Sequence, residues 1–309
     1  MTGTIACFGA AHVDYKAQAL AGVTMGSSNP VRVAESFGGV ARNVAETLAR
    51  LDIPVSIVSR VGVDPPGDNV VAELNARGID TEGISRSTTS RTASYTALME
   101  PTGEMAVAMA DMGIYDEITP GIIAPAMERL RDRTLWFVDA NLPPSALRRL
   151  LDPTATRPLV AVDTVSVAKA ARLNGLMRGI DILFVNKDEA AFLSGLDLRA
   201  PLDVCEAAHR LRAQGAGAVV ISLGSEGGFV SSDGVYDFFP ALGARVRDVT
   251  GAGDALVAGV LFGQLRGSKL DDCMRLGIAC AAMTVESAAS VSPTLTTAQI
   301  LRRAGLSPA

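Results

Sequence analysis

Residues 248–260 read DVTGAGDALVAGV, a glycine turn that runs directly into an apolar segment. The glycines at 251 and 253 permit a sharp turn, and the apolar residues that follow predict a buried helix over 252–265. The turn brings consecutive backbone N–H groups to the N-terminus of that helix, where unpaired donors and the helix dipole favour an anion. We therefore expect Gly251, Ala252 and Gly253 to form an anion hole.

Asp254 falls in the first turn of the same helix, beside the expected anion hole. A carboxylate in this position can accept the proton of a hydroxyl group while the N–H groups stabilise charge on a phosphoryl group in transfer. The alternative is an aspartate that caps its own helix after a glycine turn. This motif alone leaves both interpretations open.

The rest of the chain alternates short β-branched runs with helical segments. Continuous apolar strands between helices are typical of a parallel sheet that is covered by helices on both faces. We therefore predict an α/β fold, a three-layer α/β/α sandwich with a central, mostly parallel sheet. The predicted strands are 5–9, 55–59, 135–139, 159–162, 182–185 and 219–222, and the predicted helices are 39–51, 67–77, 144–151, 166–174, 187–193, 202–214, 252–265, 270–286 and 297–304.

Two stretches, residues 15–36 and 90–110, interrupt this alternation with extended segments of mixed polarity. Within the second, 94–100 and 104–110 are joined by Pro-Thr-Gly, a pattern that predicts a β-hairpin. Inserted strands of this kind indicate a small sheet over an active site, and the alternative is a surface hairpin without such a role. We find no repeat or low-complexity linker, and expect one domain over residues 1–309 with this sheet inserted as a lid.

The composition excludes several classes of protein. The chain has 309 residues, 48% of them hydrophobic, which is enough to fill a large core and excludes global disorder. Its 28 Lys and Arg against 33 Asp and Glu give a net charge of −5, which argues against a nucleic-acid partner. We see no signal-peptide pattern and no apolar run near the roughly 20 residues that cross a bilayer, and expect no membrane partner. Four cysteines without motif spacing predict a cytoplasmic location.

Several common catalytic motifs are missing from the sequence. It has no P-loop, no GxGxxG after a strand and no GxSxG, and its two histidines are too far apart to favour a Ser-His-Asp triad. Cys205 and His209 are four residues apart on a predicted helix, but two ligands without a third nearby make a poor zinc site. A small buried thiol and a surface imidazole are the simpler interpretation.

A second set of candidate residues lies near the N-terminus. Asp14 follows the first predicted strand, and Gly38, Gly39 and Asn43 open the first long helix. A carboxylate at a strand end beside an accessible backbone suits a ligand with several hydroxyl groups, because it can accept both hydrogens of a vicinal diol. A strand-terminal aspartate can also be a plain turn or cap residue.

Two further junctions point to a nucleotide. Asn186 and Glu189 stand at a strand-to-helix junction, where they have the reach to hold water around Mg²⁺ near phosphates, although Asn186 can equally cap the helix. After the next strand, the glycine-rich turn SLGSEGG at 222–228 can approach the phosphates or the ribose of a nucleotide closely. By itself, neither junction identifies the ligand.

Taken in order, these segments resemble the signatures of the ribokinase-like (PfkB) family of sugar and nucleoside kinases. GGVARNVAETLARL at 38–51 is similar to the first signature and DVTGAGDALVAGV at 248–260 to the second, while NKDEA at 186–190 and SLGSEG at 222–227 are similar to two shorter motifs. The resemblance covers essentially the whole chain. It implies a ribokinase-like sandwich and an ATP-dependent kinase with a small-molecule substrate. An exposed lid sheet seeks a partner, so we also expect a homodimer through the lid.

Within the family, the sequence is most similar to pseudouridine kinases. Three segments carry this similarity: NP at 29–30, residues 95–120 and VDTVSVAKAARL at 162–173. This implies transfer of the γ-phosphoryl group from Mg·ATP to the 5′-hydroxyl of pseudouridine. Two alternatives stay open. One is a PfkB kinase for another sugar or nucleoside, such as ribose, adenosine, inosine or a keto-sugar, and the other is a non-catalytic relative that only binds a ligand.

The resemblance also implies roles for individual residues. Asp254 would be the general base beside the anion hole of Gly251, Ala252 and Gly253, and the sugar would be bound by Asp14, Gly38, Gly39, Asn43 and Asn141. ATP would lie along Asn186, Ser222, Gly224 and Gly227, with Mg²⁺ bound through water by Glu189. A monovalent cation, K⁺, would be bound by the carbonyls of Asp248 and Thr250 with the 287–292 loop. Cys280 and Met283 are candidates for the adenine pocket. His12 is expected to end its strand rather than to touch the ligand.

Overall fold

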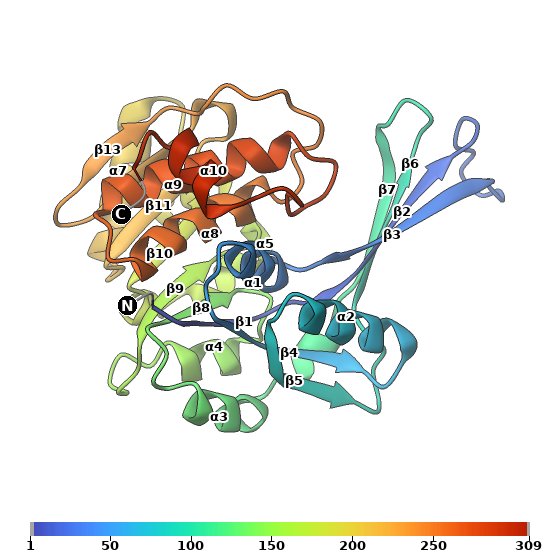
Figure 1. The fold of residues 1–309 in the computed structure, drawn as a ribbon, viewed down its shortest axis with the longest axis horizontal. Helices are drawn as coiled ribbons and strands as arrows, with labels where there is room; N and C mark the ends of the chain where they lie inside the picture. Colours follow the sequence, from blue (N-terminus) through green and yellow to red (C-terminus); the bar gives the residue numbers. More distant parts are fainter. Residues whose placement is uncertain (1–2, 308–309) are drawn as a thin grey trace.

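The structure, a computed structural model, describes residues 3–307 and contains two β-sheets within them (Figure 1). The larger sheet has nine strands in the order β13-β12-β11-β10-β9-β8-β1-β4-β5. Neighbouring strands are parallel, except that β12 and β13 extend the β11 edge in antiparallel fashion. The bounds are β1 (Ile5–Phe8), β4 (Val55–Gly62), β5 (Asp80–Ser87), β8 (Leu135–Asp139), β9 (Leu159–Asp163), β10 (Ile182–Asn186), β11 (Ala218–Ser222), β12 (Gly228–Ser231) and β13 (Tyr236–Phe239).

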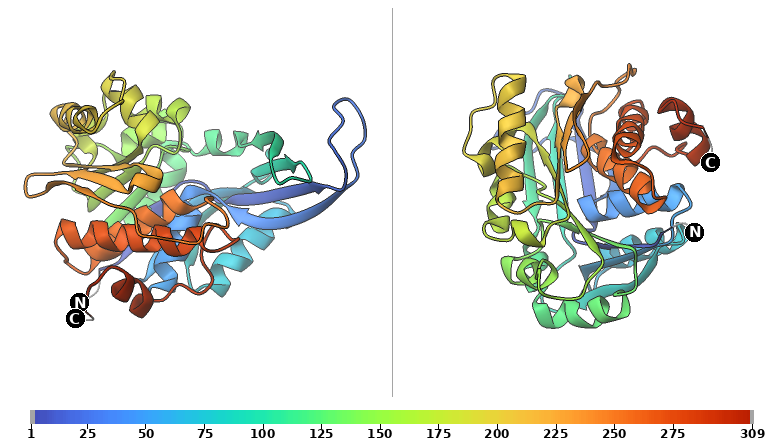
Figure 2. Two further views of the ribbon diagram at one scale, coloured as in Figure 1. Left: turned by 90° about the horizontal axis from the view of Figure 1, so that it is seen from above. Right: turned by 90° about the vertical axis from the view of Figure 1, so that its left-hand side faces the viewer.

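Helices cover both faces of this sheet, which confirms the predicted three layers (Figure 2). Helices α1, α2, α8, α9 and α10 share one apolar core with strand residues such as Cys7, while α3, α4, α6 and α7 share the other with residues such as Phe8. Adjacent strand residues thus serve opposite cores, which is why inner strands such as β1 and β8 are largely apolar. The bounds are α1 (Val40–Arg50), α2 (Pro65–Ala76), α3 (Pro120–Arg129), α4 (Pro144–Leu150), α5 (Val167–Ala170), α6 (Lys187–Ser194), α7 (Pro201–Ala213), α8 (Ala252–Leu265), α9 (Leu270–Val285) and α10 (Thr297–Arg303).

The strands that sequence patterns did not predict lie at the two edges of the sheet. Strand β5 reads DTEGISRS and is largely half-buried, because an edge strand needs no continuous apolar run. Strands β12 and β13 follow the glycine turn after β11 and form the opposite edge. The helix predicted over 166–174 is a short α5 that continues as a 3₁₀ turn over Ala171–Leu173.

The second sheet projects from the body of the molecule as a four-stranded ribbon (Figure 1). Its strands are β2 (His12–Ala19), β3 (Val31–Gly38), β6 (Ser94–Met99) and β7 (Met105–Asp111), in the order β3-β2-β6-β7. Both predicted inserted stretches therefore contribute to it, and β6 and β7 form the predicted hairpin. Strands β3 and β7 are its edges and expose most of their side chains.

Membrane spans and direct metal clusters are both missing from the part of the chain that the structure describes. No helix there is long and apolar enough to span a membrane. Within residues 3–307, no group of three or more His, Cys, Asp or Glu side chains is arranged to hold a metal ion by direct ligation. The four cysteines are free thiols.

Candidate active site

Several polar residues meet at one edge of the nine-stranded sheet. Strand β8 ends at Asp139, β9 at Asp163, β10 at Asn186 and β11 at Ser222. Neighbouring parallel strands end at the same edge, which brings these side chains together. Helix α8 begins at this edge too, so that Asp254 shares a cavity with Asp163, Asn186 and Ser222.

Asp254 lies in the first turn of α8 and faces Asn43 of α1, whose Nδ2 donates a hydrogen bond of 2.7 Å to its Oδ2. Burial raises the pKa of the Asp254 carboxyl to about 7; the carboxylates of Asp139 and Asp14 add to the rise, while the Asn43 hydrogen bond and the charge of Arg42 oppose it. A pKa near the working pH suits a general base, because such a group is both ionised in good part and basic.

A left-handed glycine shapes the start of α8. Gly251 has φ 79°, and a Cβ placed there would lie 2.0 Å from the carbonyl oxygen of Ser290. Ala252 donates its N–H to the carbonyl of Val249 at 3.2 Å, so this member of the expected anion hole is engaged within the turn. No side chain of residues 3–307 caps the helix, and Asp254 is not its cap. The next N–H groups of the first turn are therefore available to an anion.

Gly253 opens onto a cavity of about 130 Å³. A Cβ at this position would meet no atom within 4 Å, so the space in front of the backbone is free. The polar walls of the cavity are Asp163, Asn186, Glu189, Ser222 and Asp254, and its apolar walls include Val40, Phe184 and Leu256. The free volume thus lies where the anion hole is expected.

Asp163 is a carboxylate in this cavity that the sequence analysis did not single out. Burial raises the pKa of Asp163 well above its ordinary value, and the neighbouring charges of Asp254 and Glu189 raise it further. Its Oδ1 accepts a 2.7 Å hydrogen bond from the N–H of Val165, a residue held at φ 65°. The signal was present, because an aspartate ends the otherwise apolar strand LVAVD.

Asn186 and Glu189 cap helix α6, one of the two roles that the sequence left open. Asn186 caps α6 by accepting the N–H of Glu189 at 2.9 Å, and Glu189 accepts the N–H of Asn186 at 2.8 Å, a reciprocal capping box. The Glu189 carboxylate also accepts the Asn186 side-chain amide at 2.7 Å and the hydroxyl of Thr164 at 2.5 Å. These bonds fix both side chains while leaving them in the wall of the cavity.

The N-terminal residues gather beside Asp254. A Cβ at Gly38 would lie 2.2 Å from Asp14 Oδ2, so only glycine allows the carboxylate to rest on this backbone. Gly39 has φ 104°, and a Cβ there would meet the carbonyl oxygen of Ala10 at 2.3 Å. Both glycines thereby bring Asp14 and the start of α1, with Asn43, to the same edge as α8.

Asp139 is a second carboxylate that the sequence analysis did not assign to the site. It is fully buried and accepts the backbone N–H groups of Ala10, Ala41 and Asn141, each at 2.9 Å. Burial raises its pKa, although these three hydrogen bonds oppose the rise. By holding the ends of β1 and β8 and the start of α1, Asp139 fixes the backbone around Asp254.

Asn141 follows Asp139 and is nearly buried. Its Oδ1 accepts a hydrogen bond from Nζ of Lys169, and burial lowers the pKa of that lysine. The Asn141 side chain also opposes the rise in the pKa of Asp139, so it lies beside that carboxyl as well as beside Lys169. Lys169 was not a candidate from sequence, since nothing in its helix distinguishes it from a surface lysine.

The glycine turn after β11 places its members differently. Ser222 lines the cavity that contains Asp254. A Cβ at Gly224, which has φ 60°, would meet no atom within 4 Å, whereas a Cβ at Gly227 would lie 2.0 Å from the carbonyl oxygen of Phe239. Gly224 therefore borders open space, and Gly227 is needed for close packing against β13.

The expected monovalent-cation residues lie beside the glycine turn. Asp248 Oδ1 accepts the backbone N–H of Thr250 at 2.9 Å and its hydroxyl at 2.7 Å, which leaves the main-chain carbonyls unused by this turn. Lys16 of the lid strand β2 lies 3.6 Å from Asp248 Oδ2. The loop over 287–292 reaches the same place, since the Ser290 carbonyl packs on Gly251.

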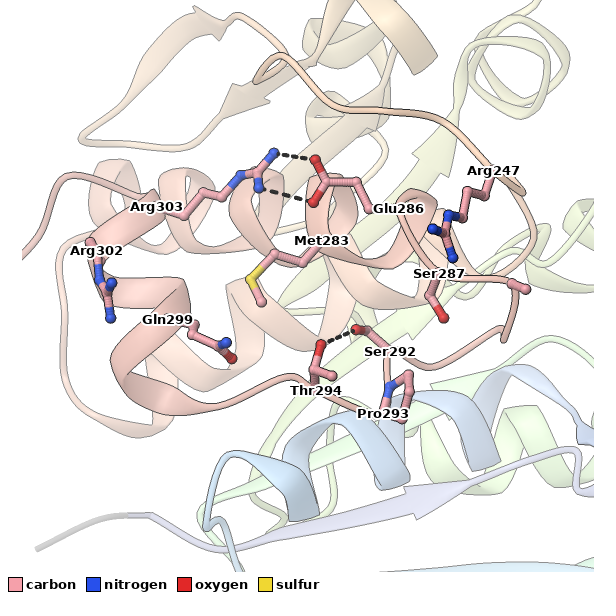
Figure 3. A pocket seen from close by; sticks show the side chains of 11 residues that line it. Arg247, Met283, Glu286, Ser287, Ser292, Pro293, Thr294, Gln299, Arg302 and Arg303 are labelled. Atoms are coloured by element: carbon pink, nitrogen blue, oxygen red, sulfur yellow. Dashed lines mark hydrogen bonds and ion pairs between the residues drawn. The ribbon is translucent and has the colours of Figure 1, made fainter.

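A separate cavity of about 510 Å³ lies between α9, α10 and the loop over 287–294 (Figure 3). Met283 lines it, next to the ion pair in which Arg303 donates to Glu286 at 2.9 and 3.0 Å. None of its lining residues borders the cavity of Asp254. Cys280 is fully buried in the core and cannot line a pocket, so its assignment to an adenine pocket is wrong.

Known proteins similar to this chain place it in a family. The family described as pfkB family carbohydrate kinase matches residues 3–297. The pseudouridine kinase of Escherichia coli K12 is 30% identical over 96% of this chain and 95% of its own length. A carbohydrate kinase from Agrobacterium tumefaciens has a solved structure with a TM-score of 0.86 and 30% identity over 99% of this chain and 98% of its own. The ribokinase of Arabidopsis thaliana, solved with ribose and ATP, shares the fold with a TM-score of 0.86 at 20% identity, over 99% of this chain and 100% of its own. This chain is therefore a member of the pfkB family of carbohydrate kinases, which transfer a phosphoryl group to an alcohol.

Proposed function

We propose that this protein transfers the γ-phosphoryl group of ATP to the 5′-hydroxyl of a ribosyl nucleoside, with pseudouridine as the first substrate to test. The observation that carries the proposal is the pairing of Asp254 with an uncapped helix start that opens onto a free cavity. The similarity to the pseudouridine kinase of Escherichia coli supports the choice of nucleoside.

In this mechanism Asp254 accepts the proton of the attacking hydroxyl. Asn43 holds its Oδ2, which leaves Oδ1 to face the substrate. The free N–H groups at the start of α8 stabilise the negative charge on the phosphoryl oxygens as the group moves between donor and acceptor. Asp14, resting on Gly38, accepts the hydroxyl hydrogens of the ribose and places the 5′-hydroxyl near Asp254.

The carboxylates of the cavity would attract a divalent cation, although in residues 3–307 they are not arranged to ligate it directly. Asp163, Glu189 and Asp254 line the same space, and the pKa of Asp163 is raised in part by the other two, a repulsion that bound Mg²⁺ would relieve. Glu189 would hold the cation through water, as its oxygens already accept three protein hydrogen bonds. Mg²⁺ would supply charge neutralisation for the phosphates of ATP. Asn186, Ser222 and Gly224 would border that nucleotide.

A monovalent cation has its own place in the proposal. The carbonyls of Asp248 and Thr250, with the loop over 287–292, would bind K⁺ outside the cavity. Because this loop packs on Gly251, the cation would stabilise the turn that presents the anion-hole donors. It would take no part in the chemical step.

The lid supports a further part of the proposal, a homodimer. Its edge strands β3 and β7 leave large side chains exposed, among them Val33, Met105 and Met109 at 60%, 54% and 58%. An exposed sheet edge readily pairs with a second copy. Pairing through the lid would cover the apolar side chains and hold the ribbon over the substrate.

A panel of acceptors tests the proposed function. The purified protein is incubated with Mg·ATP and pseudouridine, uridine, adenosine, inosine, ribose or fructose, and ADP release is measured. We expect the highest kcat/KM with pseudouridine. Tenfold higher kcat/KM with ribose or adenosine than with pseudouridine would overturn the choice of substrate. If none of these acceptors caused ADP to be released, the proposed activity would be overturned.

A further inference from the structure

Three polar side chains in close contact, Tyr115, His12 and Asp14, connect the base of the lid to the candidate active site. His12, the first residue of β2, places Nε2 3.2 Å from Asp14 Oδ1 and Nδ1 3.2 Å from the hydroxyl of Tyr115. The His12 side chain is 12% exposed, Tyr115 is 2% exposed and the Asp14 side chain is 26% exposed. The chain of groups therefore starts in the core and ends at the site.

The chemistry of these groups indicates which atom carries a hydrogen. An ionised carboxylate repels an unprotonated ring nitrogen, so the 3.2 Å approach of Nε2 to Asp14 Oδ1 favours a hydrogen on Nε2. In a neutral imidazole the other nitrogen then accepts, and the Tyr115 hydroxyl is the donor to Nδ1. Burial raises the pKa of Tyr115 well above its ordinary value, which keeps this hydroxyl protonated and able to donate.

We propose that His12 is a positioning residue, which Tyr115 holds in the Nε2–H form so that Asp14 is oriented to accept a vicinal diol. This proposal rests on the proposed function, and it names a determinant of substrate choice within it. The expectation that His12 ends its strand is wrong, because β1 ends at Phe8 and His12 is the first residue of β2. Oδ1 lies 3.2 Å from His12 Nε2 and Oδ2 rests on Gly38, so contacts at both oxygens limit the rotation of the carboxylate.

Tyr115 joins this device to the lid. It belongs to the 3₁₀ turn Gly113–Glu117, which begins two residues after β7 ends, whereas His12 begins β2. The hydrogen bond between them therefore ties together the roots of two lid strands that are 103 residues apart in sequence. The orientation of Asp14 and the root of the lid are thus set by the same contact.

Kinetics of three variants test the proposal. His12→Gln retains an N–H near the position of Nε2, whereas His12→Asn reaches only as far as Nδ1 and cannot donate to Asp14. We expect His12→Asn to raise the KM of the nucleoside about tenfold or more and Tyr115→Phe to raise it about threefold to tenfold. His12→Gln should stay within about threefold of the wild type, and the KM of ATP should not change in any variant.

The preference for a diol gives a second kinetic measure. The wild type should prefer a ribosyl acceptor to its 2′-deoxy analogue, and His12→Asn should narrow that preference. Equal increases in the KM of ATP and nucleoside, or a loss of stability without any change in nucleoside KM, would mean that His12 is only structural. A fully retained preference in His12→Asn would also overturn the proposal.

The imidazole itself can be observed without any substrate. The chain has two histidines, so in ¹⁵N-labelled protein the ring signals of His12 are assigned by comparison with His209→Gln, a change on the exposed face of α7. We expect a hydrogen on Nε2 alone in the wild type at pH 7.5, and a mixture of tautomers in Tyr115→Phe. A ring protonated on Nδ1 alone or on both nitrogens would overturn the proposal. If no panel compound is phosphorylated, the proposed activity fails, and this spectrum still decides the positioning of His12.

Discussion

Asp254 owes its expected reactivity to its surroundings rather than to its residue type. An exposed aspartate is a weak base at neutral pH, whereas burial beside Asp139 and Asp14 raises the pKa of Asp254 to about 7. Asn43 limits the rise, since its hydrogen bond favours the ionised form. The two opposing influences place the carboxyl where a small change in environment alters its charge.

The pH dependence of catalysis follows from this pKa. Only the ionised carboxylate can accept a proton, so kcat/KM should increase with pH, about tenfold per unit below the pKa, and level off above about 7. Replacing Asn43 with Ala removes a bond that stabilises the ionised form, so the rise should move to higher pH. The measurement is kcat/KM for the acceptor between pH 5.5 and 8.5. A flat profile, or a shift to lower pH in Asn43→Ala, would contradict the assignment of the titrating group to Asp254.

The junction between the turn and α8 contains two glycines with different physical requirements. Gly251 adopts a left-handed conformation against the Ser290 carbonyl, whereas Gly253 is helical and has free space in front of it. The sequence motif presents them as equivalent. In the structure the two positions differ. Gly251 is required by the left-handed backbone conformation, whereas Gly253 leaves free space that a ligand could occupy.

A matched pair of substitutions tests this difference. Gly251→Ala should lower the free energy of unfolding by about 1–3 kcal/mol, since it strains the backbone and collides with the loop over 287–292. Gly253→Val should change the free energy of unfolding by only a few tenths of a kcal/mol, yet abolish activity, since its side chain fills the cavity. Urea unfolding and ADP release measure the two effects. Retained activity in a folded Gly253→Val protein would exclude the cavity as the place of phosphoryl transfer.

Prediction from sequence succeeded for elements whose pattern is complete within a few residues. Strands β8, β9 and β10 each show an apolar run that is unbroken up to the last residue, and the glycine turn at 248–254 marks the start of α8. Strand β5 was missed because an edge position tolerates polar residues. Asp163 and Asp139 were missed as site residues because their role depends on which strands are neighbours, and the order of strands in a sheet is not local information.

At the scale of the whole molecule, the chain consists of a helix-covered body and a projecting ribbon (Figure 1). The nine-stranded sheet and its two helical layers hold Asp254, Glu189 and Asn186 at strand ends and helix starts. The four-stranded lid carries Asp14 on β2 and exposes its edges (Figure 1). In the proposed function, substrate binding depends on how the ribbon is held relative to the body.

The proposed dimer is tested through a lid edge. Met109→Lys places a charge on β7, where the side chain is 58% exposed, and should convert a dimer to a monomer at micromolar concentration because a charge opposes edge pairing. Met25→Lys, in the loop between β2 and β3 at 76% exposed, is the matched control and should remain dimeric. Sedimentation velocity distinguishes the two masses. A wild-type monomer would contradict the proposed dimer.

The central claim is that Asp254 removes the proton of the acceptor hydroxyl beside the start of α8. Its most direct test is the single-turnover rate of Asp254→Asn with saturating Mg·ATP and nucleoside, with nucleoside binding followed by calorimetry. Asparagine preserves the shape of the side chain but is not a base, so we expect the rate to fall by about 10²–10⁴-fold while the nucleoside still binds. Asp271→Asn, in the exposed first turn of α9, is the matched control and should react at the wild-type rate. A rate in Asp254→Asn within threefold of the wild type would contradict the role of Asp254.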